Sequence, residues 1–296
     1  MRAGARLADW AATVIFWSVA LSVMAFLGFM LWYVLYHGVK WVDWDFLTKP
    51  PQIIRGGGGI GPQLFNSFYL LVLSMAFTAP LGLLGGIYLA EYARPGKISE
   101  AIRLAVETLS SLPSIVVGLF GLLVFVSFTG WGYSLMAGAL ALTTINLPLV
   151  VRVSEQAVRG VPGSLREASL ALGANRWQTV LKVMLPAAFP SLVSGLIIAC
   201  GRVFGEAAAL LFTAGMSSPG LDFSNWNPLD PSSPLNPFRP AETLAVHIWK
   251  VNTEGLIPDL RRVADGSAAV LVMVVVGFNV LARWAARIVH RRMAGA

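Results

Sequence analysis

The chain has 296 residues, of which 56 % are hydrophobic and only 12 % are charged, and its mean hydropathy is +0.69. A soluble domain carries charges on about 25 % of its residues, so this composition excludes a soluble globular protein. Several stretches longer than the roughly 20 residues that cross a bilayer contain few charges or none. This uneven distribution predicts membrane-spanning helices rather than one large buried core.

Six apolar segments in chain order are long enough to cross a membrane. One long uncharged run is divided into two spans, because Thr129-Gly130-Trp131-Gly132 in its middle is typical of a turn. The predicted spans are 11–36, 64–90, 108–128, 133–151, 186–214 and 266–282. The sequence therefore predicts an all-α, polytopic membrane protein with six transmembrane helices.

The basic residues predict the orientation of these spans. With both termini in the cytoplasm, the inner segments carry fourteen basic and six acidic residues, and the outer segments carry seven and eight. This distribution follows the positive-inside rule and accounts for the net charge of +7 without a nucleic-acid partner. Four arginines at 283, 287, 291 and 292 are expected to flank the last span and contact anionic lipid. The first span is too long for a signal-peptide core and has no cleavage site after it, so we expect it to stay in the mature chain.

The sequence lacks the patterns that enzymatic or metal chemistry requires. Cys200 is the single cysteine, and the three histidines at 37, 247 and 290 are too scattered for a metal site. The Gly56–Gly59 run lacks the Gly-Lys-Ser/Thr continuation of a P-loop, so we predict no ATP site. Uphill transport by this chain would therefore need energy from a partner or from an ion gradient.

The cytoplasmic loop between the fourth and fifth spans carries the most informative pattern. Ser164 and Glu167 are spaced as a capping box, which predicts a short helix that starts at Leu165. Gly173 is placed to end this helix in a left-handed conformation. The stretch Asn175–Gln178 repeats the capping signal and predicts a second short helix.

Apolar side chains would form one face on each of these two helices. They are Leu165, Ala168 or Ser169, and Leu172 on the first helix, and Trp177, Val180, Leu181 and Met184 on the second. A capped surface of this kind favours docking into a groove on another protein. The alternative is an amphipathic segment that lies in the lipid interface.

This loop resembles the EAA loop of ABC-importer permeases. Glu167-Ala168-Ser169, Gly173 and Val183-Met184-Leu185-Pro186 follow the spacing of that motif, with Ser169 in place of an alanine and Val183 in place of an isoleucine. The resemblance implies a coupling helix that docks into a cleft of a separate ATP-binding subunit. It assigns to this surface Ser164, Leu165, Glu167, Ala168, Ser169, Leu172, Gly173, Trp177 and Pro186.

Further motifs resemble the phosphate-importer branch of this family, and its A-type (PstA-type) permease subunit in particular. They are Gly59-Ile60-Gly61-Pro62, Asn66-Ser67, Ile87–Tyr92, Leu112–Phe120, Gly201–Ala207, the proline-rich Leu235–Pro240 and Thr243-Leu244. Ala207-Ala208 departs from the family pattern, in which a threonine is more usual.

The resemblance implies the type I ABC importer (MetI-like) fold and import of inorganic phosphate by alternating access across the bacterial cytoplasmic (inner) membrane. It implies a transport subunit, not an enzyme, with no cofactor of its own, because a partner ATPase binds the ATP. The implied partners are a second permease subunit (PstC-type), two ATP-binding subunits (PstB-type), an external phosphate-binding protein (PstS-type) and membrane lipid.

The domain organisation expected from these motifs has three parts. An N-terminal helix with an external segment (1–63) precedes a MetI-like permease domain (64–282), and a basic cytoplasmic tail (283–296) follows it. The permease domain includes the cytoplasmic EAA loop (152–185) and an external loop (215–265).

Arg202 and Glu206 are the two charged residues inside a predicted span. Their i, i+4 spacing would place them on one helix face, where they can neutralise each other while the path is empty. An intramembrane arginine costs at least ~2.5–3.5 kcal/mol, so it should face the bundle or an aqueous path. We expect Arg202 to attract a passing phosphate and Glu206 to prevent trapping. The alternative is a structural ion pair.

Two further segments have simpler interpretations. Residues 91–107 carry balanced charges and predict a helix that lies in the interface, separated from the second span by Arg94-Pro95-Gly96. Residues 217–240 contain six prolines and predict an ordered, non-helical cap that contacts a solute-binding protein.

Three functional alternatives stay open at this stage. A permease for sulfate or molybdate would look similar, because the charge of Arg202 cannot distinguish one oxyanion from another. A secondary transporter should show more intramembrane acids and inverted repeats. A membrane-embedded enzyme would need a catalytic constellation that the sequence does not supply.

Overall fold

The computed structural model describes residues 2–52, 56–255 and 259–294, and every regular element in these ranges is helical. Five helices are long and apolar enough to cross a membrane: α1 (Arg2–Gly38), α3 (Gly61–Ile87), α6 (Leu135–Arg159), α9 (Leu185–Gly205) and α12 (Leu260–Ala294). The remaining predicted span, 108–128, falls on a bent pair of helices, α4 (Lys97–Ser111) and α5 (Ser114–Gly121). The all-α class is thus confirmed. Those parts of the predicted segments that fall on 1, 53–55, 256–258 and 295–296 lie outside the described residues.

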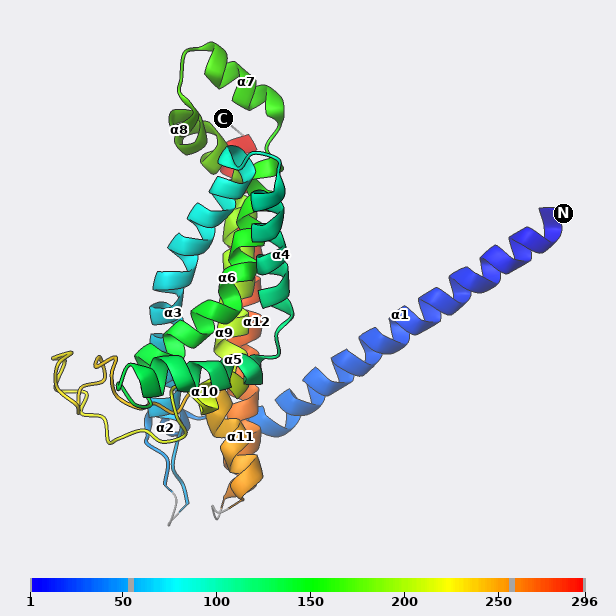
Figure 1. Ribbon diagram of the computed structural model, residues 1–296. Coiled ribbons are helices and arrows are strands. Elements are labelled where there is room, and N and C mark those ends of the chain that lie inside the picture. Colours follow the sequence, from blue (N-terminus) through cyan, green and yellow to red (C-terminus); the bar gives the residue numbers. More distant parts are fainter. Residues whose placement is uncertain (1, 53–55, 256–258, 295–296) are drawn as a thin grey trace.

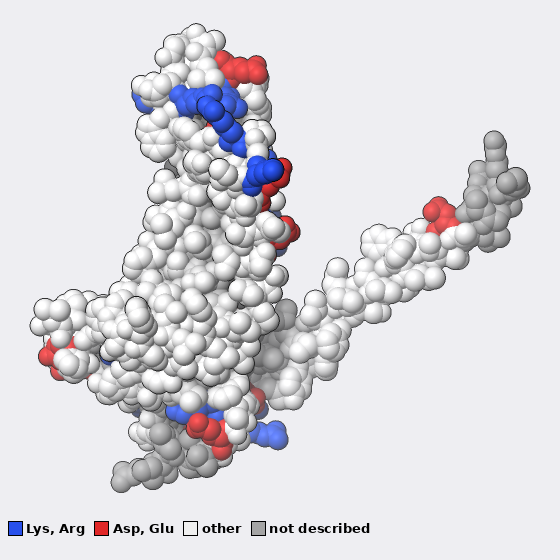
Figure 2. Space-filling view, in the orientation of Figure 1, with Lys and Arg blue, Asp and Glu red and all other residues white. Residues whose placement is uncertain are grey.

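The helices α3, α6, α9 and α12 form an upright bundle (Figure 1). Two short helices, α7 (Gly163–Ala171) and α8 (Arg176–Thr179), lie at one end of the bundle, which we call the coupling-loop end. At the opposite end, the cap end, lie α2 (Trp44–Thr48) and α11 (Leu244–Glu254). Charged side chains gather towards these two ends and leave an uncharged surface between them (Figure 2). This belt is the surface that a bilayer requires.

Glycines bring the bundle helices close together. On α3, Gly82 lies against Val150 of α6, and a Cβ added to Gly86 would approach the Cβ of Ser154 and come within 2.7 Å of the Glu155 backbone nitrogen. Helices in a membrane associate through such small residues, because close backbone approach maximises van der Waals contact. The α3–α6 pair is therefore a tightly packed unit.

The first helix leans away from the bundle (Figure 1). It meets α12 near its own C-terminal end, where Gly38 lies against the backbone of Asp265 and the side chain of Ala269. No residue of its most apolar stretch is buried by the rest of this chain. Only its last turns are therefore fixed by intramolecular packing.

The third predicted span, 108–128, is found as part of a bent helix pair rather than as one continuous helix. The chain bends by 99° between α4 and α5, at Leu112-Pro113, because Pro113 removes a helical N–H and adopts an extended conformation as the N-cap of α5. A π-helical segment, Leu122–Phe128, continues α5. The interface-lying helix predicted within 91–107 is also wrong, since α4 runs beside α6 and is joined to it by ion pairs.

The predicted non-helical cap at 217–240 is confirmed. Asp, Asn and Ser side chains close a succession of tight turns along it, as in the bonds from the Ser224 and Ser232 amides to Asp222 and Asp230. The cap is tied to the bundle because the free N–H groups at the start of α6 need acceptors. The Leu135 amide donates to the Arg239 carbonyl, and the Met136 amide donates to the Pro237 carbonyl.

Candidate functional site

The coupling loop is an elbow formed by the two short helices α7 and α8 at one end of the bundle (Figure 1). Helix α7 starts at Gly163, two residues before the predicted Leu165, and its N-cap is Pro162. The Ser164 side chain makes no capping bond, so the predicted capping box with Glu167 is wrong. Pro162 holds a fixed φ and begins the helix in place of Ser164.

The end of α7 confirms the predicted elbow. Gly173 adopts a left-handed φ of +85°, and its amide donates to the Leu170 carbonyl. The Ala174 amide donates to the Ser169 carbonyl, which completes a Schellman motif. A side chain at position 173 would be strained in this conformation, so glycine is required by the backbone.

The second helix begins at the predicted capping box but does not end where expected. Asn175 Oδ1 accepts from the Gln178 amide at 2.8 Å, and Gln178 Oε1 accepts from the Asn175 amide at 3.0 Å. Helix α8 then continues through a π-helical segment, Val180–Met184, into α9. The predicted boundary at Pro186 is therefore wrong, since Pro186 lies in the first turn of a run that is already helical.

The apolar side chains of the loop divide into two groups. Leu172 is 89 % exposed and Trp177 is 49 % exposed, and Leu165 and Leu181 are exposed as well. In contrast, the side chains of Val180 and Met184 are buried against α6. The single face predicted for Trp177, Val180, Leu181 and Met184 is therefore split. Val180 and Met184 fix the loop to the bundle, and the exposed residues form an outward apolar surface.

Two polar contacts hold the elbow in place. The Ser169 hydroxyl lies 2.9 Å from the Thr179 hydroxyl and joins α7 to α8. Arg166 Nε lies 3.2 Å from Glu91 Oε2 and joins α7 to the π-helical segment Tyr88–Tyr92 at the end of α3. Glu91 is nearly buried, whereas Arg166 is partly exposed. Ser169 is thus a useful departure from the alanine of the motif, because it adds a bond between the two helices.

The predicted helical pair of Arg202 and Glu206 does not form. Helix α9 ends at Gly205, and Glu206 adopts an extended conformation, so the i, i+4 relation does not hold. No ion pair joins Arg202 to Glu206 in the part of the chain that the structure describes. Arg202 is exposed at the surface of this single chain, and Glu206 Oε1 accepts from the Ala209 amide at 3.3 Å.

The break after Gly205 is built into the packing around it. Phe204 packs against Phe68 and Phe278, with ring centroids 5.1 and 5.7 Å away. The next helix, α10 (Ala208–Leu211), lies under α5, where a Cβ on Gly118 would be 2.8 Å from the Ala209 Cα. The predicted fifth span, 186–214, is therefore too long, and its last part is a separate turn held by α5.

Sequence reasoning missed a buried polar network at the cap end. Arg239 is 3 % exposed and donates to Asn66 Oδ1 at 2.7 Å and to the Pro234 carbonyl at 2.9 Å. Burial lowers the pKa of Arg239 to about 10, so it stays charged at neutral pH. The one sequence signal for the network is a polar face, Gln63, Asn66 and Ser67, at the start of an apolar helix.

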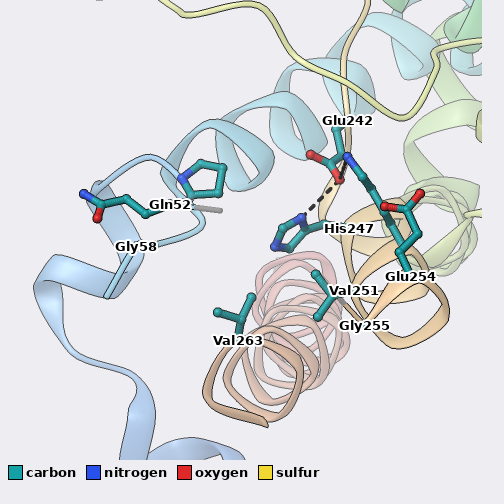
Figure 3. A pocket seen from close by; sticks show the side chains of 11 residues that line it. Gln52, Gly58, Glu242, His247, Val251, Glu254, Gly255 and Val263 are labelled. Carbon is teal, nitrogen blue, oxygen red and sulfur yellow. Dashed lines mark hydrogen bonds and ion pairs between the residues drawn. The ribbon is translucent and has the colours of Figure 1, made fainter. Parts of the chain in front are cut away.

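Glu242 is the centre of the same network. His247 Nδ1 lies 3.1 Å from the Glu242 carboxylate, and Gln63 Nε2 donates to it at 3.0 Å. Burial acts to raise the pKa of Glu242, but the contacts with His247, Gln63 and Lys250 outweigh it and lower the pKa. His247 lies between this carboxylate and the side chains of Val251 and Val263 (Figure 3). The network joins α3, the cap and α11.

The fold and the coupling loop define a class of membrane transport subunit. The family model for the inner membrane component of binding-protein-dependent transport systems matches residues 82–295, and the chain belongs to this family. The coupling loop, the end of α9 and the cap with α11 fall within the matched residues, whereas Gln63, Asn66 and Phe68 of α3 precede them.

The chain is also similar to individual permease proteins. The chain is 53 % identical over 288 residues to a probable ABC transporter permease protein, YqgI, of Bacillus subtilis, covering 97 % of this chain and 98 % of that protein. It is 39 % identical to the phosphate transport system permease protein PstA of Xylella fastidiosa, over 60 % of this chain and 62 % of the relative. For the PstA protein of Yersinia pestis the identity is 33 %, over 90 % and 86 %.

Solved structures of ABC transporters share the fold. A chain of the MetNI methionine ABC transporter aligns with a TM-score of 0.57 at 22 % identity, covering 78 % of this chain and 94 % of the other. A chain of the bacterial alginate ABC transporter, solved with an alginate-bound periplasmic protein, aligns with a TM-score of 0.63 at 15 % identity, over 93 % of both chains. The fold is therefore that of the MetI-like type I ABC importer permeases, as the sequence predicted.

Proposed function

We propose that this chain is a permease subunit that imports inorganic phosphate across the bacterial cytoplasmic membrane by alternating access. The observation that carries the proposal is the coupling loop, an outward apolar elbow that is fixed to the bundle through Arg166 and Glu91. Through such an elbow, a movement of a docked protein can be transmitted to the transmembrane helices. The phosphate cargo is supported by the PstA relatives at 31–39 % identity.

The coupling surface needs an ATP-hydrolysing partner, because the chain has no nucleotide-binding motif. Its proposed contact residues are Ser164, Leu165, Glu167, Ala168, Ser169, Leu172, Gly173, Trp177 and Pro186. Two ATP-binding subunits (PstB-type) and a second permease (PstC-type) would complete the membrane complex. The coupling-loop end then faces the cytoplasm, which agrees with the excess of basic residues there.

At the opposite end, the cap is the proposed docking site for an external phosphate-binding protein (PstS-type). Phe223, Trp226 and Leu229 are exposed on its ordered turns, and exposed aromatic residues are typical of protein contacts. The buried Arg239 fastens this surface to α3 through Asn66. Removal of 219–233 should abolish binding of the external protein and leave assembly of the membrane complex intact; unchanged binding would contradict this role.

The proposed substrate contact is Arg202, with Glu206 close to it in the chain. The structure changes the expected arrangement, because Glu206 accepts a hydrogen bond from the first turn of α10 and makes no ion pair with Arg202 among the described residues. An unengaged guanidinium suits a tetrahedral oxyanion, since it can donate two parallel hydrogen bonds.

The test is ATP-dependent uptake of labelled phosphate into vesicles that hold the reconstituted complex, with sulfate as the competitor. We expect weak competition by sulfate and a loss of uptake in Arg202→Ala. Equal inhibition by sulfate would favour a permease for sulfate or another oxyanion instead. An Arg202→Ala complex that assembles and imports phosphate normally would contradict the role of this residue.

A further inference from the structure

Three arginines line a cavity at the coupling-loop end of the bundle, and Arg202 is not among them. The cavity measures about 410 Å³ and lies between α4, α6 and the π-helical segment Tyr88–Tyr92. Arg103 comes from α4, and Arg152 and Arg159 come from α6. The two acidic residues that line it are Glu107 and Glu155.

Ion pairs hold two of the arginines in fixed positions. Arg103 Nη2 and Arg159 Nη2 each lie 3.0 Å from the same carboxylate oxygen, Glu155 Oε1. Both side chains also donate to the Leu89 carbonyl, at 3.4 and 3.2 Å. Glu155 is mostly buried, and its shared oxygen holds the two guanidiniums side by side at the cavity wall.

The third arginine is engaged much more weakly. Arg152 Nη2 lies 3.7 Å from Glu107 Oε1, and both side chains are largely exposed, so solvent screens this pair. Three guanidinium groups face two carboxylates, and the cavity carries a net charge of +1. Most of their N–H groups have no acceptor among the described residues, and they are half exposed and accessible.

The positive-inside rule accounts for basic residues at this end, but it does not require three arginines to converge on one cavity. Packing of α4 on α6 is satisfied by the Arg103–Glu155 pair, and Arg152 adds a third positive charge that contributes little to stability. Guanidiniums that converge from two helices on one open cavity are suited to an anion with several oxygen acceptors. A phosphate group has that chemistry.

We propose that this cavity binds a phosphate group, through Arg152 and the free N–H groups of Arg103 and Arg159. The group can come from two sources, the headgroup of an anionic lipid or free inorganic phosphate. Both are available at this end of the bundle if it faces the cytoplasm. The lipid source is independent of the transported substrate, so the inference goes beyond the proposed function.

The test uses the full chain in nanodiscs, without ATP or transport. For free phosphate, discs of phosphatidylcholine alone carry the Arg202→Ala variant, and binding of labelled orthophosphate is measured. For lipid, discs with phosphatidylglycerol are used, and the lipid retained after delipidation is counted by native mass spectrometry. In at least one of the two measurements, Arg152→Gln should reduce binding about tenfold or more.

Matched variants separate binding from charge and folding. Lys97→Gln removes one positive charge from α4 outside the cavity and should bind as the parent does. Arg152→Lys keeps the charge without the planar fork and should bind less tightly than arginine. Arg152 makes one long, exposed contact, so its loss should leave the thermal unfolding temperature unchanged. Equal binding by Arg152→Gln and Lys97→Gln in both measurements would overturn the proposal, and so would no binding above empty discs. Normal phosphate uptake alongside either result would keep the proposed function intact.

Discussion

The contact between Arg166 and Glu91 predicts how firmly the coupling loop is attached to the bundle. Replacing Arg166 with alanine removes a charged partner 3.2 Å from a carboxylate whose side chain is 7 % exposed. A hydrogen bond to a charged group contributes about 1.5–3 kcal/mol, and the partial exposure of Arg166 reduces this to about 1–2 kcal/mol. The expected result is a five- to thirtyfold shift towards a detached loop, by the usual conversion of free energy into populations.

Hydrogen exchange of the full chain in nanodiscs measures this shift directly. Backbone amides of α7 should lose about five- to thirtyfold of their protection in Arg166→Ala, whereas amides in the middle of α6 should keep theirs. Arg176→Ala is the matched control, because Arg176 is exposed on α8 and no ion pair is seen for it among the described residues. A double variant with Glu91→Ala should add little to Arg166→Ala. Unchanged protection in Arg166→Ala, or equal loss in Arg176→Ala, would refute the reasoning.

Three other substitutions or conditions follow from the geometry. Gly173→Ala should destabilise the loop by about 1–2 kcal/mol, because φ is +85° at this position. Hydrogen exchange of the loop during thermal unfolding should show this destabilisation. The control Gly163→Ala should leave the exchange unchanged, because an added Cβ meets no atom within 4 Å there. Gly86→Ala should lower the unfolding temperature by forcing α3 from α6, whereas Gly28→Ala, where the space is open, should leave it unchanged; equal effects would contradict the close approach. Acid should loosen the cap, because hydrogen bonds lower the pKa values of Asp222 and Asp230, and contacts with His247, Gln63 and Lys250 outweigh burial and lower the pKa of Glu242. Folded pKa values below the unfolded ones stabilise the cap above about pH 4, and that contribution is lost as the pH falls further. Protease cleavage within 217–240 should therefore rise between about pH 4 and pH 3.

Local features of the coupling loop could be predicted because their causes lie within a few residues. Gly173 ends α7 since a left-handed position needs glycine, and the Asn175–Gln178 box is a short-range exchange of hydrogen bonds. Ser164 has the right spacing as well, but Pro162 starts the helix earlier and leaves its hydroxyl unused. Two nearby residues could each start the helix, and the spacing of the motif did not show that Pro162 would start it instead of Ser164.

The bends in the spans could not be predicted from apolar composition, because that composition continues through them. Leu112-Pro113 lies inside an uncharged run, and the chain turns by 99° there without any change in hydrophobicity. The break after Gly205 depends on α5 lying against α10, which is a contact between distant segments. Likewise, the network of Asn66, Arg239 and Glu242 joins residues more than 170 positions apart, so no local window contains it.

The end of α9 also changes how the charge of Arg202 is balanced. Arg202 lies in the last turn of α9, and the final carbonyl groups of a helix carry the negative end of its macrodipole. This end stabilises a nearby cation by about 0.3–1 kcal/mol without any carboxylate. A partial charge fixed in the backbone cannot be titrated or displaced, whereas a glutamate partner can. The helix itself therefore provides the counter-charge of Arg202, while Glu206 serves the first turn of α10.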